Sequence, residues 1–114
     1  MNHDMTLYDD PFNAIQSKEK LVEIRLWDQK RRQLKVNDTI TFTKLSNPLE
    51  TLTVRVMALD RFPTFKEMYE TLPDQILGAY GQTVDQMLDD TYEIYSQEQE
   101  QHWGTVAIHI EVIH

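Results

Sequence analysis

The chain has 114 residues, 40% of them hydrophobic, which is enough for one hydrophobic core and too few for two, so we expect a single domain over residues 1–114. The absence of cysteine excludes disulfides, thiolate zinc sites and cysteine nucleophiles, and the formal net charge of −8 argues against indiscriminate binding to phosphate backbones. The sequence has no signal-peptide pattern and no apolar run near the roughly 18 residues of a membrane span, so we expect a cytoplasmic protein that makes no use of the membrane.

A short helix is predicted to lead into the first strand. Proline suits the first position of a helix, and Phe12 and Ile15 follow Pro11 at helical spacing. This helix would deliver the chain to residues 20–27, which alternate as a half-buried strand does.

Two opposite charges share one face of this strand. Successive strand side chains point to opposite faces, so one face carries Val22, Ile24 and Leu26, and the other carries Leu21, Glu23, Arg25 and Trp27. Charged groups are rarely buried unless they are paired. Glu23 and Arg25 therefore form either a structural ion pair at the mouth of a barrel or part of a ligand site, and the nearby Lys20 favours the ligand site.

A β-hairpin is predicted next. Asn37 and Asp38 mark a tight turn before residues 39–43, whose alternation and β-branched content indicate a strand. Residues 51–59 alternate in the same way after a second turn at residues 46–48. We expect these two strands to pair antiparallel.

Two helices and a long strand are expected in the C-terminal half. Thr64 and Glu67 have the spacing of a capping box, and Pro73 ends the helix that follows them. Residues 83–95 have the pattern of a second amphipathic helix with an acidic outer face. Residues 104–113 predict the last strand, with one face formed by Val106, Ile108, Ile110 and Val112.

Several short sequence blocks are typical of one protein family when their order and spacing are considered together, although no single block is specific for it. They are Pro11-Phe12 with Ile15, Glu23-Ile24-Arg25, residues 34–40, Ala58-Leu59 with residues 61–65, Tyr95-Ser96 with Glu98, and residues 104–108. In this order and spacing the sequence resembles the ASCH (ASC-1 homology) domain family of the PUA-like superfamily, over nearly the whole chain. The resemblance implies an α+β fold, a small and mostly antiparallel PUA-like β-barrel flanked by helices, with a cleft for RNA or a nucleotide-like ligand.

The chain departs from the family pattern at two turns. The family usually has glycine at the positions of Lys18 and Asn37. Asparagine enters left-handed turn conformations more readily than most residues, so Asn37 is a tolerable replacement. Lys18 adds a charge where the flexibility of glycine is usual.

The residues of the predicted cleft favour binding of a nucleotide or an RNA end. Lys20 and Arg25 can contact phosphate or a base edge, and Glu23 can accept hydrogen bonds from exocyclic amines or ribose hydroxyls. Trp27 and Tyr95 are either stacking residues for a base or core residues. With a further hydroxyl donor, the predicted ligand-binding residues are Lys20, Glu23, Arg25, Trp27, Tyr95 and Ser96; no cofactor is predicted.

The charge distribution fits such a cleft. Residues 16–35 contain seven Lys or Arg and three Asp or Glu, whereas residues 67–101 contain nine acids and no Lys or Arg. The basic stretch is either a patch for an anionic ligand or a merely solvated face. In a third functional alternative, the acidic helical face docks a basic protein partner.

Hydrolase activity is the main alternative to binding. One bacterial branch of the ASCH family removes an acyl group from the exocyclic amine of modified cytidine with a lysine, a threonine and a glutamate. Lys20 matches the lysine, Glu23 stands where the threonine would be, and residues 77–82, the loop expected to supply the glutamate, contain none. Lys20 and Glu23 are the catalytic candidates if the chain is an enzyme, but Glu23 would hold Lys20 protonated.

Metal-assisted ribonuclease activity has also been suggested for ASCH proteins. It needs carboxylates that converge on a divalent ion, and the sequence offers Glu23 without a second carboxylate that can be placed. No ligand spacing is found among His3, His102, His109 and His114, so no metal site is predicted.

Overall fold

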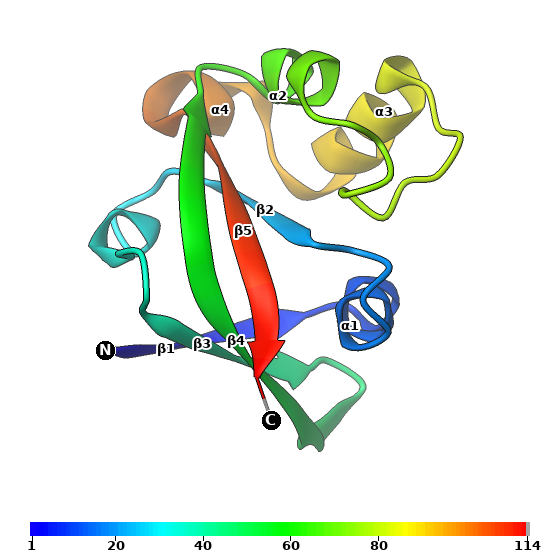
Figure 1. Cartoon of the computed structure of the whole chain (residues 1–114). Coiled ribbons are helices and arrows are strands. Elements are labelled where there is room, and N and C mark those ends of the chain that lie inside the picture. The colour runs from blue at the N-terminus through cyan, green and yellow to red at the C-terminus, as the bar shows by residue number, and fades with distance from the viewer. Residues whose placement is uncertain (114) are drawn as a thin grey trace.

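Five segments of alternating polar and apolar residues form one strongly curved sheet, a half-barrel (Figure 1). The computed structural model describes residues 1–113. The strands lie in the order β1-β3-β4-β5-β2, and all neighbours pair antiparallel except β1 with β3. They are β1 (Asn2–Leu7), β2 (Val22–Leu26), β3 (Thr39–Lys44), β4 (Asn47–Phe62) and β5 (Thr105–Ile113). The mostly antiparallel barrel predicted from the sequence is confirmed as a half-barrel, and β3 and β4 form the predicted hairpin.

Strand β1 lies outside the elements predicted from the sequence. It pairs with β3 in parallel, from Asn2 opposite Thr39 to Leu7 opposite Lys44. Its alternate residues His3, Met5 and Leu7 are buried. β1 and β2 are the two edges of the sheet, so the half-barrel opens between them.

Four helices surround the sheet, and three of them gather over one end of it (Figure 1). They are α1 (Asp9–Gln16), α2 (Phe65–Thr71), α3 (Val84–Ile94) and α4 (Gln97–Trp103), with a short 3₁₀ turn η1 (Arg31–Gln33) after β2. The predicted helices α1, α2 and α3 are confirmed, whereas α4 was not predicted. Among residues 1–113 no helix has the length and apolar character to cross a bilayer, and the cytoplasmic location stays a prediction.

The helix caps explain where these helices begin. The Thr64 hydroxyl accepts from the Glu67 backbone N–H at the start of α2, which is one half of the predicted capping box. Full capping boxes start α3 at Thr83 with Gln86 and α4 at Ser96 with Gln99. Each such cap satisfies backbone N–H groups that the first helical turn leaves without partners.

Strand β2 separates two hydrophobic clusters. The first fills the half-barrel beneath α1 and includes Phe12, Phe42 and Val54. The second lies beneath α2 and α3 and includes Val22 and Phe65. The alternation of β2 follows this division, with Val22 and Leu26 in the second cluster and Trp27 against the first.

The two departures from the family pattern have the backbone conformation that favours glycine. Lys18 has φ 67° and Asn37 has φ 78°, and they are the non-glycine residues with positive φ within residues 1–113. Asparagine tolerates this region better than most residues, whereas lysine has no such advantage. The usual glycines of the family therefore match a real conformational demand at both turns.

Candidate functional site

Lys20, Glu23 and Arg25 converge in one ionic cluster at the start of β2. Lys20 Nζ lies 3.2 Å from Glu23 Oε1, and Arg25 Nε donates to Glu23 Oε2 at 2.8 Å. The Glu23 side chain is 6% exposed, and the side chains of Lys20 and Arg25 are each 13% exposed. The predicted pair of Glu23 and Arg25 therefore forms, and Lys20 completes it on the other carboxylate oxygen.

The two cations keep Glu23 ionised. Burial by itself favours the neutral acid, but the charges and hydrogen bonds of Lys20 and Arg25 outweigh it and hold the pKa of Glu23 below its ordinary value. The pKa of Arg25 is raised, because the attraction of Glu23 exceeds the cost of burial. A carboxylate with a lowered pKa and a cation on each oxygen is a weak general base.

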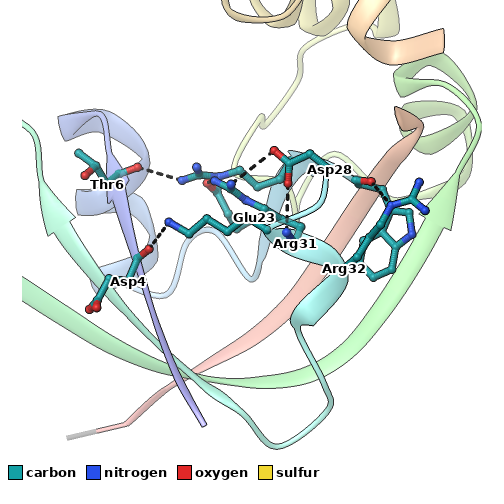
Figure 2. Close-up of polar contacts among 9 residues, drawn as sticks. Asp4, Thr6, Glu23, Asp28, Arg31 and Arg32 are labelled. Carbon is teal, nitrogen blue, oxygen red and sulfur yellow. Dashed lines mark hydrogen bonds and ion pairs between the residues drawn. The ribbon is translucent and has the colours of Figure 1, made fainter. Parts of the chain in front are cut away.

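Arg25 and Lys30 also bridge the open edge of the half-barrel (Figure 2). Arg25 Nη2 donates to the backbone carbonyl of Thr6 at 2.9 Å, and Lys30 Nζ donates to that of Asp4 at 2.7 Å. Both acceptors belong to β1, whose outer edge has no neighbouring strand in the described part of the chain. Two cationic side chains thus lie between β2 and β1 and donate hydrogen bonds to the free carbonyl groups of β1.

Arg31 is a further cation at this site that was not predicted. Its Nη1 lies 3.5 Å from Asp28 Oδ2, and its buried Nε has no hydrogen-bond partner within residues 1–113. Burial and the neighbouring Arg25 lower the pKa of Arg31. In the sequence it is one of three consecutive cations, and nothing in that run distinguishes it from its neighbours.

The ionic cluster forms one wall of a pocket of about 240 Å³. The opposite wall comes from α3 and its C-terminal end, including Thr91 and Tyr95. Aromatic and aliphatic side chains supply most of the remaining lining, which consists of Thr6, Leu7, Tyr8, Pro11, Ile24, Tyr69, Asp90 and Ile94. A mainly apolar lining with a few converging polar groups is typical of small-molecule sites.

Two tyrosines hold the α3 wall in place. Burial raises the pKa of Tyr69 to about 12. Its hydroxyl lies 2.6 Å from that of Thr91, which donates to the Met87 carbonyl. Tyr95 stacks on Phe65 with 5.6 Å between ring centroids, and burial raises its pKa as well. Both side chains are therefore neutral phenols at pH 7.

Of the six predicted ligand-binding residues, the pocket brings together Lys20, Glu23, Arg25 and Tyr95. Trp27 does not line it and instead belongs to a second pocket at the other end of β2. Ser96 does not line it either, because its hydroxyl accepts from the Gln99 N–H and begins α4.

The loop after α2 packs against Lys20. Gly78 has φ +72°, and a Cβ atom there would lie 2.9 Å from the Cβ of Lys20, so glycine permits the close approach. The Leu21 N–H donates to the Ile76 carbonyl at 2.8 Å. This is the loop where the hydrolase branch is expected to carry its glutamate, and residues 77–82 bring no carboxylate to Lys20.

A second buried glutamate, Glu100, was missed from the sequence. It accepts from the Phe65 N–H at 2.7 Å and from the Tyr92 hydroxyl at 2.9 and 3.1 Å. These contacts tie α4 to the first turn of α2, where a negative charge is favourable. The sequence signal for Glu100 was its position four residues after Ser96, the cap of α4. Nothing in the sequence distinguishes Glu100 from Glu98, which is on the same helix.

No triple of His, Asp or Glu side chains suited to a metal ion occurs within residues 1–113. His3 lies 2.8 Å from Asp38, and His109 lies 2.7 Å from Asp60. His102 is exposed, and His114 lies outside the described residues.

An acidic groove adjoins the pocket on the side of α1 and α3. It shares Tyr8, Pro11, Asp90 and Ile94 with the pocket and adds the acids Asp9, Asp10 and Glu93. Among residues 1–113, no Lys or Arg lines this groove. The pocket thus has a cationic wall on β2 and an acidic border on α3.

Comparison with known proteins gives this chain its family. The model of the ASCH domain matches residues 5–114. The crystal structure of hypothetical protein PH0355 is similar, with 31% identity, a TM-score of 0.88 and coverage of 99% of this chain and 100% of that one. Protein PF0455 from Pyrococcus furiosus, solved by NMR, has 29% identity, a TM-score of 0.76 and coverage of 99% and 98%.

A more distant structure shares the fold. The ASCH protein from Zymomonas mobilis has 14% identity and a TM-score of 0.60, with coverage of 96% of this chain and 66% of that one. A search of the curated proteins gave no match. The predicted resemblance is confirmed, and the chain belongs to the ASCH domain family.

Proposed function

We propose that the protein binds RNA or a nucleotide-like ligand in the pocket between β2 and α3. The observation that carries this proposal is the convergence of Lys20, Glu23 and Arg25 on one wall of a pocket whose other wall holds Tyr95. The site combines cations, one ionised acceptor and aromatic surface, which are the groups that phosphate, base edges and bases need.

Lys20 and Arg25 have more N–H donors than their contacts within the protein use. A lysine ammonium has three N–H donors and a guanidinium has five. Within residues 1–113, Lys20 contacts Glu23, and Arg25 donates to Glu23 and to the Thr6 carbonyl. Glu23 thus fixes both cations in the pocket wall, and their remaining N–H groups are available to a ligand.

Hydrolysis is the less favoured use of the same pocket. Both oxygens of Glu23 contact cations, and its pKa is lowered, so the carboxylate is poorly suited to activate water. The loop at Gly78 supplies no second carboxylate. An acylated-cytidine amidohydrolase or a ribonuclease would therefore need groups beyond those that meet at Lys20.

The test is an NMR and thermal-shift titration with ribonucleoside monophosphates, short RNAs and acylated cytidines, followed by product analysis. We expect saturable shifts around Lys20, Glu23 and Arg25 and no product. Lys20→Ala should weaken binding about tenfold, whereas Lys66→Ala, which removes an exposed lysine of α2, should leave it unchanged. Equal affinity of both variants and the parent would contradict the site, and released cytidine or cut RNA would establish the hydrolase.

The acidic groove supports a second candidate, the docking of a basic protein segment. Tyr8, Leu45 and Ile94 are each more than half exposed and lie among the acids of this groove. Apolar side chains surrounded by one sign of charge are common at protein interfaces. A Leu45→Asp variant should abolish such docking and leave nucleotide titrations unchanged, because Leu45 lines the groove and not the pocket.

A further inference from the structure

Both tryptophans of the chain lie in one cluster with two arginines, beyond the end of β2. The Arg32 guanidinium carbon lies 5.9 Å from the ring centroid of Trp27 and 5.8 Å from that of Trp103. The Arg61 guanidinium carbon lies 5.1 Å from the Trp27 centroid. We call Trp27, Arg32, Arg61 and Trp103 the Trp–Arg cluster.

The two arginines of the cluster differ in their roles. Arg32 Nε donates to the Trp27 carbonyl at 2.7 Å, and its Nη2 donates to the Trp103 carbonyl at 3.3 Å. These bonds tie the end of β2 to the end of α4. Arg61 is exposed, and no residue among 1–113 accepts a hydrogen bond from it or pairs with its charge. Its cation–π contact to Trp27 therefore leaves all five N–H donors free.

The surroundings of Arg61 suit an anionic ligand with a flat part. A pocket of about 300 Å³ lies here, lined by Trp27, Arg61, Phe62, Pro63, Trp103, Gly104 and Thr105. None of the acidic residues that the structure describes lines it. Unpaired guanidinium groups and aromatic rings are the elements with which proteins hold the phosphates and bases of single strands.

The location of the cluster relative to the ligand pocket gives the direction of a bound chain. Strand alternation puts Arg25 and Trp27, the residue after the end of β2, on the same side, about 7 Å apart along the chain. Figure 2 shows Glu23 and Arg31 between Thr6 at one end and Arg32 at the other. On the opposite side, the acidic groove would repel a chain of phosphates.

We propose that the Trp–Arg cluster binds a second nucleotide of single-stranded RNA, next to the nucleotide held in the pocket. Arg61 contacts the phosphate of this second nucleotide, and the base of the nucleotide stacks on the tryptophan or guanidinium surface. The RNA then leaves the pocket toward η1 and α4 and away from α3. The inference rests on the proposed function, because the first nucleotide occupies the pocket.

Tryptophan fluorescence reports on this cluster alone, since the chain has no other tryptophan. The experiment titrates the four ribonucleoside monophosphates and the four homotetranucleotides of single-stranded RNA, with fluorescence and NMR readouts on the same samples. Tetranucleotides should change the fluorescence and bind at least about fivefold more tightly than monophosphates. Monophosphates should shift pocket resonances with little change in fluorescence.

Arg61→Ala isolates the cluster, because the Arg61 side chain makes no hydrogen bond to any residue among 1–113 and its backbone stays in β4. The variant should bind monophosphates as the parent does, lose the advantage of tetranucleotides and reduce the salt slope of tetranucleotide binding by about one. Arg55→Ala is the matched control, since Arg55 is an exposed arginine about 20 Å away along the same strand β4. It should leave both affinities unchanged.

The outcomes separate the two proposals. Pocket binding with equal affinity for monophosphates and tetranucleotides, or an unchanged tetranucleotide affinity in Arg61→Ala, overturns the cluster and leaves the proposed function intact. No binding of either probe overturns both. A fluorescence change that Arg55→Ala abolishes and Arg61→Ala preserves also overturns the cluster.

Discussion

Glu23 and Glu100 are buried to nearly the same depth, with 4% and 5% of each residue exposed, but different groups surround them. Glu100 accepts hydrogen bonds from the Phe65 backbone N–H and the Tyr92 hydroxyl, and both donors are neutral. Glu23 contacts two cations, Lys20 and Arg25. One carboxylate joins two helices, whereas the other holds charges in the wall of a pocket.

The two carboxylates differ in how many hydrogen-bond donors remain free on the groups that surround them. The donors around Glu100 are a single N–H and a single O–H, and both point at the carboxylate. The cations around Glu23 have more N–H groups than Glu23 can accept, and they line the pocket. A buried carboxylate therefore indicates a ligand site when its partners retain donors in a pocket, and a structural site when they do not.

The largest effect is expected at the structural carboxylate. Glu100→Ala leaves the Phe65 N–H and the Tyr92 hydroxyl without acceptors, so it should lower the free energy of unfolding by about 4 kcal/mol. Chemical denaturation measures this loss, and Glu98→Ala on the same helix, where the side chain is exposed, serves as the control. Equal losses in the two variants would show that the buried contacts of Glu100 contribute little.

A smaller loss is expected at the cationic site. Glu23→Gln keeps one acceptor for Arg25 but removes the charge that holds Lys20, so the free energy of unfolding should fall by about 2 kcal/mol. Unlike Glu100→Ala, it should also weaken nucleotide binding, because the two cations lose their fixed positions. If Glu23→Gln costs stability while binding persists unchanged, the pair is structural and the contrast with Glu100 fails.

The pH dependence of stability sharpens the same contrast. The pKa of Glu23 in the folded protein lies below its ordinary value of 4.5, so its stabilising effect is complete above pH 4.5 and is lost as the pH falls through the folded pKa. The difference in unfolding free energy between the parent and Glu23→Gln should therefore shrink as the pH is lowered from 7 toward 3. A difference that stays constant over this range would show that the charge of Glu23 does not stabilise the fold.

The predictable part of the site was local. Alternation along β2 was sufficient to place Glu23 and Arg25 on one side and Val22 and Leu26 on the other, and the structure has this arrangement. Glu23 and Arg25 are two residues apart, so strand geometry alone brings them together. Lys20 precedes β2 and lies three residues from Glu23, so alternation does not explain their contact.

The parts that were not predicted depend on distant contacts. Glu100 is distinguished from Glu98 by Phe65, which is 35 residues away in sequence. Strand β1 shows a weak alternation, and its parallel pairing with β3 is set by residues far along the chain. Arg31 stands in a run of cations, and only the fold brings it to Asp28 and Arg25. Sequence pattern carries no record of such partners.

The smallest effect is expected at Ser96, which separates the two regions in the clearest way. Its hydroxyl begins α4, the helix of Glu100, and does not line the pocket of Glu23. Ser96→Ala should therefore cost about 1 kcal/mol of unfolding free energy, whereas Ser96→Asp, which can also cap a helix, should restore it. Neither variant should alter nucleotide affinity in the NMR titration. Ser96→Ala could instead bind nucleotide more weakly, with no recovery in Ser96→Asp. This result would show that Ser96 belongs to the ligand site and that the α4 cap and the pocket are not separate regions.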